Sequence, residues 1–107
     1  MINMTFEVKY SERAINDLDE IIGYISDKLF GPKSAEKFYE AVKEKLELLS
    51  EYPYMYPLYH DDKLRSEGYR FAVIGNYLMF YLVDDDSSIV NIARILYRKL
   101  DTPSSFG

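Results

Sequence analysis

Residues 69–107 of this 107-residue chain carry three of its five arginines, and these lie with tyrosines among apolar, strand-like stretches. Guanidinium and ammonium groups bind the phosphates or carboxylates of a partner. A phenol is a weak general base at neutral pH because its unperturbed pKa is about 10. The candidates for contact with a target are Arg70, Arg94, Tyr97, Arg98 and Lys99, and the groups of a hydrolytic site would be Arg70, Tyr81, Arg94 and Tyr97.

The arginines also have purely structural interpretations. Arg94 and Arg98 are four residues apart in an apolar stretch, which on a strand places both side chains and Leu96 on one face. Either Arg94 contacts a partner or it pairs with a carboxylate of the helices, and Arg70 likewise has a binding and a structural interpretation. Arg98 and Lys99 precede the C-terminal tail, where we expect them to be exposed to a partner.

Two other groups of polar residues favour ordinary loops. His60 precedes Asp61 and Asp62, but a solvated loop histidine explains this pattern better than an acid–base pair. The run 84–86 consists of three aspartates without the alternating ligands of a calcium loop, which predicts a solvated turn. The chain has no cysteine and one histidine, so we expect no metal and no cofactor.

The net charge of −5 weighs against simple nucleic-acid binding, which needs clustered Lys and Arg. Residues 1–51 contain 7 Lys and Arg against 11 Asp and Glu, whereas residues 52–107 contain 6 against 7. Four of the five arginines lie in the second half, so a local positive face is compatible with the acidic total. The N-terminus shows no signal pattern and no apolar run approaches the ~20 residues of a membrane span. We expect a cytoplasmic protein with no membrane association.

The first half of the chain predicts a strand and two helices. Residues 5–10 alternate apolar and polar side chains, as a half-buried strand does. Ser11 fits the N-cap of a helix that Gly31-Pro32 ends, and Ser34 opens a second helix that ends before Pro53. The apolar positions at helical spacing are Ala14, Leu18, Ile21, Ile22, Ile25 and Leu29 in the first helix, and Ala35, Phe38, Val42, Leu46 and Leu49 in the second.

The second half predicts an antiparallel meander. Its strands cover 69–74, 77–83 and 89–98; Gly75-Asn76 fits a two-residue hairpin turn and 84–88 a looser one. The aromatic segment 52–68 is expected to be a loop over the core. The chain is thus predicted to be one α+β domain, 1–107, in the order β-α-α-β-β-β, with a partly flexible tail at 101–107. A helical hairpin covers one face of the antiparallel sheet, and the opposite face is predicted to be free for a partner.

These elements and motifs resemble the RelE/ParE superfamily, the toxins of bacterial toxin–antitoxin pairs. The resemblance is carried by Arg70, by residues 75–81 (Gly-Asn-Tyr-Leu-Met-Phe-Tyr) with the acidic turn after them, and by residues 94–99 (Arg-Ile-Leu-Tyr-Arg-Lys) with Asp101. Asp17, Leu18, Ile21, Tyr24 and Ile25, with Pro53 after Leu49, are similar to ParE-type members.

The resemblance implies two alternative targets. RelE-type members cleave mRNA on the ribosome, whereas ParE-type members block DNA gyrase. Leu78 stands where nuclease members often carry an Arg that stabilises phosphate charge, and Tyr97 stands where many relatives carry His. The chain therefore lacks the best general base and one of the cations expected at an RNA-cleaving site. We therefore expect a ParE-like gyrase inhibitor; the alternatives are a ribosome-dependent endoribonuclease and a degenerate, non-toxic member that still binds antitoxin.

The resemblance also implies partners. A cognate ParD- or RelB-like antitoxin is expected to fold across the toxin and form a hetero-oligomer with it. The cellular target would be DNA gyrase, or alternatively the ribosome with its mRNA.

Overall fold

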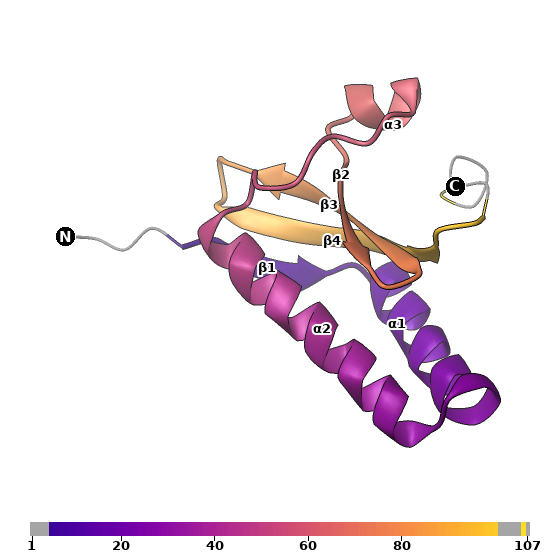
Figure 1. Ribbon diagram of the computed structural model, residues 1–107. Coiled ribbons are helices and arrows are strands. Elements are labelled where there is room, and N and C mark those ends of the chain that lie inside the picture. The colour runs from indigo at the N-terminus through magenta and orange to yellow at the C-terminus, as the bar shows by residue number, and fades with distance from the viewer. Residues whose placement is uncertain (1–4, 101–105, 107) are drawn as a thin grey trace.

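The computed structural model describes residues 5–100 and 106, and it shows helices packed on a four-stranded sheet (Figure 1). The elements, in chain order, are β1 (Glu7–Tyr10), α1 (Glu12–Tyr24), η1 (Ile25–Leu29), α2 (Pro32–Glu51), α3 (Asp62–Ser66), β2 (Arg70–Ile74), β3 (Tyr77–Asp84) and β4 (Ile89–Tyr97). The predicted α+β class and the order of the main elements are confirmed. The tail prediction falls almost entirely on residues outside the described ones.

The sheet has the strand order β1-β4-β3-β2. β2 pairs with β3, and β3 with β4, in antiparallel fashion, which confirms the predicted meander. Gly75 has a φ of 58°, the positive value that a two-residue hairpin turn requires. β1 departs from the prediction, because it joins the edge of β4 in parallel and makes the sheet mixed. The helical hairpin connects β1 at one edge of the sheet to β2 at the other edge. β1 therefore pairs with β4, the last strand of the meander, and runs in the same direction.

The two long helices follow local signals in the sequence. Ser11 caps α1 as predicted, since its hydroxyl accepts a hydrogen bond from the amide of Ala14 at 3.0 Å. α2 begins at Pro32, two residues before the predicted start, because proline is well suited to a first helical position, where no intrahelical partner for its nitrogen is required. Between them the last turn of the first helix widens into the π-helix η1, which the apolar pattern does not predict.

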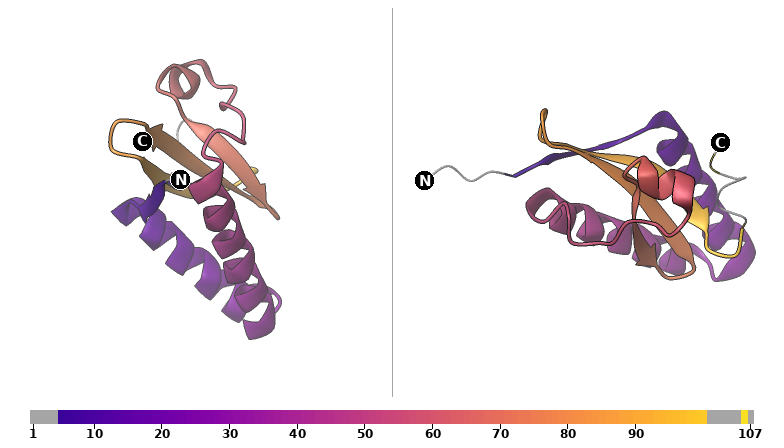
Figure 2. Two further views of the ribbon diagram at one scale, coloured as in Figure 1. Left: turned by 90° about the vertical axis from the view of Figure 1, so that its left-hand side faces the viewer. Right: turned by 90° about the horizontal axis from the view of Figure 1, so that it is seen from above.

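The main core lies between the helical hairpin and one face of the sheet. Figure 2 shows α1 and α2 side by side beneath the sheet, with α3 on its other side. Fully buried side chains include Ala14 and Val42 from the helices and Met79, Tyr81 and Ile92 from the strands. This arrangement confirms the predicted helix-covered face. Among the described residues, no helix is long and apolar enough to cross a membrane.

The opposite face of the sheet is not free, and this part of the prediction is wrong. Residues of the 52–68 segment and Phe106 pack on it and form a second apolar cluster. The ring of Tyr59 lies 5.0 Å from that of Phe80, and the ring of Phe106 lies 5.2 Å from it on another side. The short helix α3 contributes the buried Leu64. These aromatic side chains cover the face because β2 and β3 present Phe71, Leu78 and Phe80 to it.

Candidate functional site: two arginine sites and an apolar groove

Arg94 is held in a bidentate ion pair with Asp17 of α1. Its Nε donates to Asp17 Oδ2 at 2.7 Å and its Nη2 donates to Asp17 Oδ1 at 3.0 Å. The two side chains are only 12% and 13% exposed. The hydrogen bond to Asp17 raises the pKa of Arg94, so the guanidinium stays charged. Of the two interpretations open for Arg94, the structure shows the ion pair with a helical carboxylate.

The same carboxylate also closes an open edge of the sheet. β4 is longer than β1, so beyond Tyr10 the edge of β4 that faces away from β3 has no neighbouring strand. Ser11 donates its hydroxyl to the carbonyl of Ala93 at 2.9 Å, and the amide of Ile95 donates to Asp17 Oδ2 at 3.0 Å. Asp17 therefore satisfies a backbone donor and a guanidinium together. A role for Arg94 in target binding would have to act through this pair.

Arg70 anchors the loop that follows α2. Its Nη1 donates to the carbonyl of Tyr56 at 2.7 Å, and its guanidinium carbon lies 4.9 Å from the ring centre of Tyr54. The hydroxyl of Tyr54 in turn donates to the carboxylate of Asp85. Arg70 is half-buried, and its guanidinium contacts both a backbone carbonyl and the face of an aromatic ring.

Tyr81 lies opposite Arg70 in the β2–β3 pairing and is fully buried among core side chains. Burial raises its pKa to about 12, although the backbone of Tyr56 and the charge of Arg70 act in the other direction. A phenol with a raised pKa holds its proton more firmly and is a still weaker base. Its position in the core favours a packing role over proton transfer.

The end of β4 presents a different set of side chains. Tyr97 is 39% exposed, and Arg98 and Lys99, which follow the last residue of the strand, are exposed as predicted. Arg98 lies one residue beyond β4, so the strand predicted over 89–98 is one residue too long at this end. The amide of Arg98 donates to the carbonyl of Asn76 at 2.8 Å, which ties this end of the chain to the β2–β3 turn.

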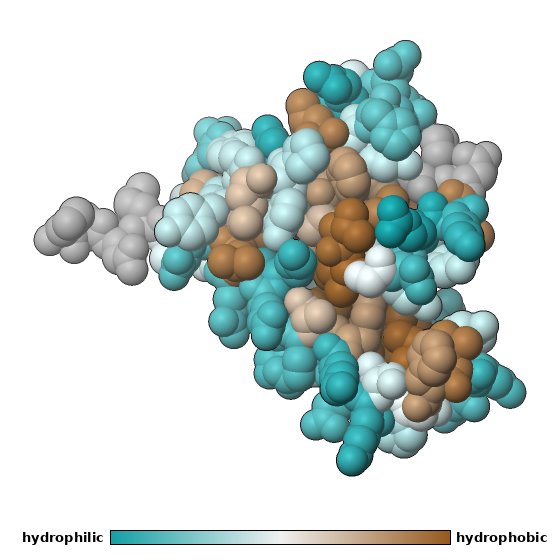
Figure 3. All heavy atoms as spheres, in the orientation of Figure 1, coloured by the Kyte–Doolittle hydropathy of each residue, from teal (hydrophilic) through white to brown (hydrophobic). Residues whose placement is uncertain are grey.

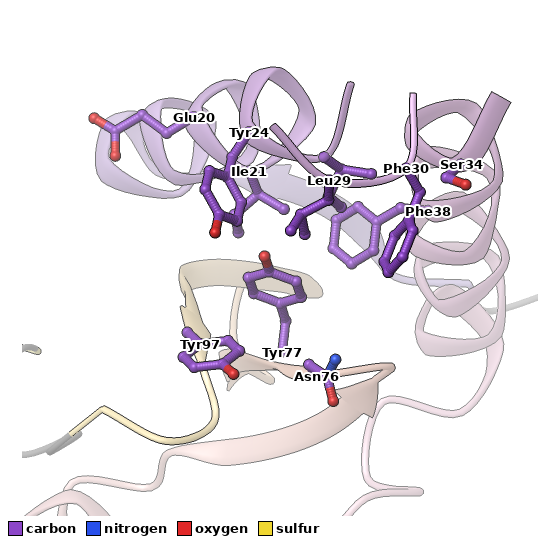
Figure 4. A pocket seen from close by; sticks show the side chains of 11 residues that line it. Glu20, Ile21, Tyr24, Leu29, Phe30, Ser34, Phe38, Asn76, Tyr77 and Tyr97 are labelled. Carbon is purple, nitrogen blue, oxygen red and sulfur yellow. The ribbon is translucent and has the colours of Figure 1, made fainter. Parts of the chain in front are cut away.

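Tyr97 also lines an open groove between the end of the helical hairpin and the sheet (Figure 4). We call it the hairpin-end groove; its volume is about 860 Å³. The helical side is formed by Glu20, Ile21, Tyr24, Ile25, Leu29, Phe30, Ser34 and Phe38, and the sheet side by Asn76, Tyr77 and Tyr97.

The sheet side of the groove is aromatic. Tyr77 points from β3 toward the helices, and its ring lies 5.1 Å from Phe38 and 5.7 Å from Tyr97 (Figure 4). Desolvation raises the pKa of Tyr77, with smaller contributions from Tyr24 and Tyr97, so its hydroxyl stays neutral. The rings of Phe38, Tyr77 and Tyr97 thus form a continuous aromatic surface in the groove.

The helical side carries large apolar side chains that the protein itself leaves uncovered. Phe30 is 78% exposed, Tyr24 52% and Leu29 46%. In the space-filling view, hydrophobic atoms gather at this end of the hairpin (Figure 3). Leu29, which the sequence places at helical spacing with the apolar residues of the first helix, lies at the end of the π-helical turn η1 and is nearly half exposed. The sequence signal that could have indicated this exposed apolar surface is Phe30 directly before Gly31-Pro32, since a large apolar residue in a turn is seldom buried.

The remaining polar candidates are occupied or peripheral. His60 is exposed and its ring stacks on Tyr59 at 4.2 Å. In the acidic turn, hydrogen bonds from the side chain and then from the amide of Ser87 lower the pKa of Asp84. Leu78 is buried in the second apolar cluster, so it acts there as a packing residue. Within residues 5–100 and 106, no three His, Asp or Glu side chains form a group that could hold a metal ion.

Comparison with known protein families identifies the chain. Residues 8–101 match the family model of the ParE toxin of type II toxin–antitoxin systems. The chain belongs to the RelE/ParE toxin superfamily. It is thus the toxin component of a type II toxin–antitoxin system. A comparison of its sequence with curated proteins gave no significant match.

Solved structures of RelE/ParE toxins share the fold. The chromosomal ParDE system of P. aeruginosa matches with a TM-score of 0.68 at 20% identity, covering 88% of this chain and 97% of that one. A mutant of E. coli RelE in the free state matches at 0.63 and 16%, covering 95% and 93%. The RelBE2 toxin–antitoxin complex of Mycobacterium tuberculosis matches at 0.61 and 24%, covering 88% and 99%. Both branches of the superfamily are therefore similar to this chain in fold.

Proposed function

We propose that this toxin acts as a ParE-like inhibitor of DNA gyrase and is neutralised by a cognate ParD- or RelB-like antitoxin. The observation that carries the proposal is the separation of the four residues that an mRNA nuclease would use. Arg70 and Tyr81 are paired at one end of the β2–β3 ladder, whereas Tyr97 pairs with Tyr77 at the other end. Three strand residues lie between Tyr77 and Tyr81, and the four residue steps along the strand correspond to a separation of ~13 Å.

The chemistry of these residues supports the same conclusion. Arg94 is engaged by Asp17, and Tyr81 is buried with a raised pKa. Acid–base cleavage of RNA needs a base and a cation within reach of one phosphate. Tyr97, Arg98 and Lys99 are exposed together at the end of β4 and suit contact with a large target better than proton transfer.

Pulse labelling tests the target. Minutes after the toxin is induced without antitoxin, we expect incorporation of labelled thymidine to fall before that of labelled methionine. An early fall in methionine with DNA synthesis intact would assign the toxin to the ribosome. No change in either would identify a non-toxic member of the superfamily.

A matched pair of variants tests the proposed contact residues. Arg98→Ala with Lys99→Ala is expected to abolish growth inhibition, because it removes the two exposed cations at the end of β4. Lys63→Ala with Arg65→Ala removes two exposed cations from α3 and is expected to leave inhibition intact. Colony counts after induction provide the measurement. Equal inhibition by both double variants would contradict the assignment of Arg98 and Lys99.

A further inference from the structure

We infer that Phe106 is a positioning residue that holds the segment after β4 so that Arg98 and Lys99 are presented to the cellular target. The inference rests on the proposed function, because that function assigns target contact to these two cations. Phe106 follows Lys99 by seven residues, and the sequence predicts it only as part of a partly flexible tail. Three features carry the argument: the ring contacts of Phe106, the hydrogen bonds to its carbonyl, and the fixed start of the segment.

The ring of Phe106 is docked against two aromatic side chains of the sheet region. Its centre lies 4.7 Å from that of Tyr69, which directly precedes β2, and 5.2 Å from that of Phe80 on β3. Both contacts are edge-to-face, with interplanar angles of 74° and 90°, a geometry that aromatic pairs favour. Phe80 belongs to a central strand and is fully buried, so Phe106 packs on a side chain with a fixed position.

The backbone of Phe106 is held separately from its ring. Its carbonyl oxygen accepts hydrogen bonds from Arg13 Nη1 at 3.1 Å and from Arg94 Nη1 at 3.3 Å. Arg13 belongs to α1 and Arg94 to β4, so these contacts attach Phe106 to a helix and to the sheet. Arg94 is itself fixed by its bidentate pair with Asp17, and charged donors make stronger hydrogen bonds than neutral ones. The side chain and the main chain of Phe106 are therefore both anchored.

The segment that leads to Phe106 is also fixed where it begins. The amide of Arg98 donates to the carbonyl of Asn76 at 2.8 Å, and the amide of Leu100 donates to that of Tyr97 at 3.0 Å. Phe106 follows Leu100 by six residues, which span at most ~20 Å when fully extended. The chain after β4 is therefore held at two points a short distance apart in the sequence, and this restricts its conformations.

The anchor bears on target contact because Arg98 and Lys99 lie between the end of β4 and Phe106 and are exposed. With Phe106 docked, the two cations are presented from a restricted segment, so less conformational freedom is lost when they meet a partner. Without the anchor the segment loses one of its two attachments, and each group that has to be immobilised on binding then adds to the cost of contact.

A merely structural role makes a different prediction, and Phe71 provides the matched control. Phe71 belongs to the same apolar cluster as Phe106, is likewise partly buried, and its ring lies 5.2 Å from that of Tyr59. Phe71→Ala thus removes a partly buried phenylalanine from this cluster, as Phe106→Ala does, but keeps the attachment of the segment after β4. Loss of cluster packing is common to both variants, whereas loss of the anchor is specific to Phe106→Ala.

Backbone order parameters of the purified full-length chain test the anchor directly. In the wild type we expect S² of about 0.85 at Phe106, the value of a rigid backbone, and Phe106→Ala should lower it below about 0.6 and also lower S² at Lys99. Phe71→Ala should keep the wild-type values at both positions, and Phe106→Tyr, which keeps an aromatic ring, should restore them. Equal order parameters in the wild type and Phe106→Ala would overturn the inference.

Growth inhibition in cells without antitoxin tests whether the anchor serves target contact. Phe106→Ala is expected to raise the toxin level required for half-maximal inhibition at least about tenfold, because the cations are then presented from a mobile segment. Immunoblots measure that level. Phe71→Ala should raise it less than about twofold at a comparable loss of stability, and Phe106→Tyr should restore the wild-type level. An equal rise in Phe106→Ala and Phe71→Ala would show that Phe106 has a structural role alone.

Arg13→Ala provides a second test that does not touch the apolar cluster. Arg13 is exposed on α1, so its removal should keep the fold, but it takes away a donor to the carbonyl of Phe106. We expect the required toxin level to rise about twofold to tenfold, the factor that one hydrogen bond contributes. Arg65→Ala removes an exposed arginine from α3 and should leave the level unchanged. Equal levels for these two variants would contradict the anchor at the carbonyl.

Failure of this inference can be distinguished from failure of the proposed function. If Arg98→Ala with Lys99→Ala abolishes inhibition while Phe106→Ala does not weaken it, the positioning role is wrong and the proposed contact stands. If the double variant inhibits growth as the wild type does, Arg98 and Lys99 are not the target contacts and the inference falls with them. A wild-type chain that does not inhibit growth would overturn both.

Discussion

The middle of the last strand and the residues just after its end contrast sharply, although the sequence at each place contains an arginine and neighbouring apolar residues. Arg94 is held by two hydrogen bonds to Asp17 and is 12% exposed. Arg98, four residues later, lies past the end of β4 and is exposed. One arginine completes the fold and the other is presented to a partner. The contrast arises because α1 supplies a carboxylate next to Arg94, whereas within the described residues the side chain of Arg98 is exposed.

The two candidate tyrosines divide in the same way. Tyr81 is fully buried between the sheet and the helices, whereas Tyr97 is 39% exposed beside the hairpin-end groove. A bulge between Phe80 and Tyr81 shifts the pairing register between β3 and β4, so the two tyrosines lie in parts of the ladder with different register. A tyrosine in a strand therefore indicates a binding surface only where the strand extends past the elements that cover it.

The largest effect expected from this contrast is on the stability of the fold. Arg94→Ala leaves the carboxylate of Asp17 buried without its cation, and we expect it to lower the free energy of unfolding by about 3 kcal/mol or more. Urea unfolding followed by circular dichroism measures the change. Asp17→Ala with Arg94→Ala is the control, since removing both charges should recover part of the loss. A loss under about 1 kcal/mol for Arg94→Ala would show that the pair is not structural.

The second expected effect is an alkaline loss of stability caused by Tyr81. Its pKa is raised from 10.0 to about 12 in the folded state, so folding favours the neutral phenol. This contribution is complete below pH 10 and is lost as the pH rises toward 12. The free energy of unfolding should fall by up to about 2.7 kcal/mol over that range because of this one group.

Comparison of Tyr81→Phe with Tyr97→Phe isolates that effect. In Tyr81→Phe the alkaline decline should be shallower than in the wild type, because the variant lacks the phenol whose pKa burial raises most. Tyr97→Phe removes the exposed phenol and should keep the wild-type decline. Unfolding midpoints in urea between pH 9 and pH 12 give the answer, and parallel declines in all three proteins would exclude Tyr81 as the source.

The smallest expected effect is on the stability of the Arg98→Ala, Lys99→Ala double variant. Both side chains are exposed, so the free energy of unfolding should change by less than about 0.5 kcal/mol. Thermal unfolding of the variant and the wild type checks this. Loss of growth inhibition together with unchanged stability would separate the exposed residues after β4 from the structural pair in its middle most clearly.

The sequence by itself determined the class, the strands of the meander and the helix cap. These follow from local rules: period-2 and period-3.6 apolar patterns, a serine before an apolar helix, and glycine at a turn that needs positive φ. The hydroxyl of Ser11, the turn at Gly75 and the helix end near Glu51 all lie where local chemistry predicts them. Each rule involves residues that are neighbours in the chain.

Only the tertiary structure decided which charged and aromatic residues are available to a partner. Asp17 and Arg94 are 77 residues apart in the sequence, so no local pattern predicts their ion pair. The parallel docking of β1, the cover over the far face by Tyr59 and Phe106, and the exposure of Leu29 likewise depend on distant contacts or on the π-helical turn. Exposure is a property of what packs against a residue, and that is fixed when the helical hairpin and the sheet come together.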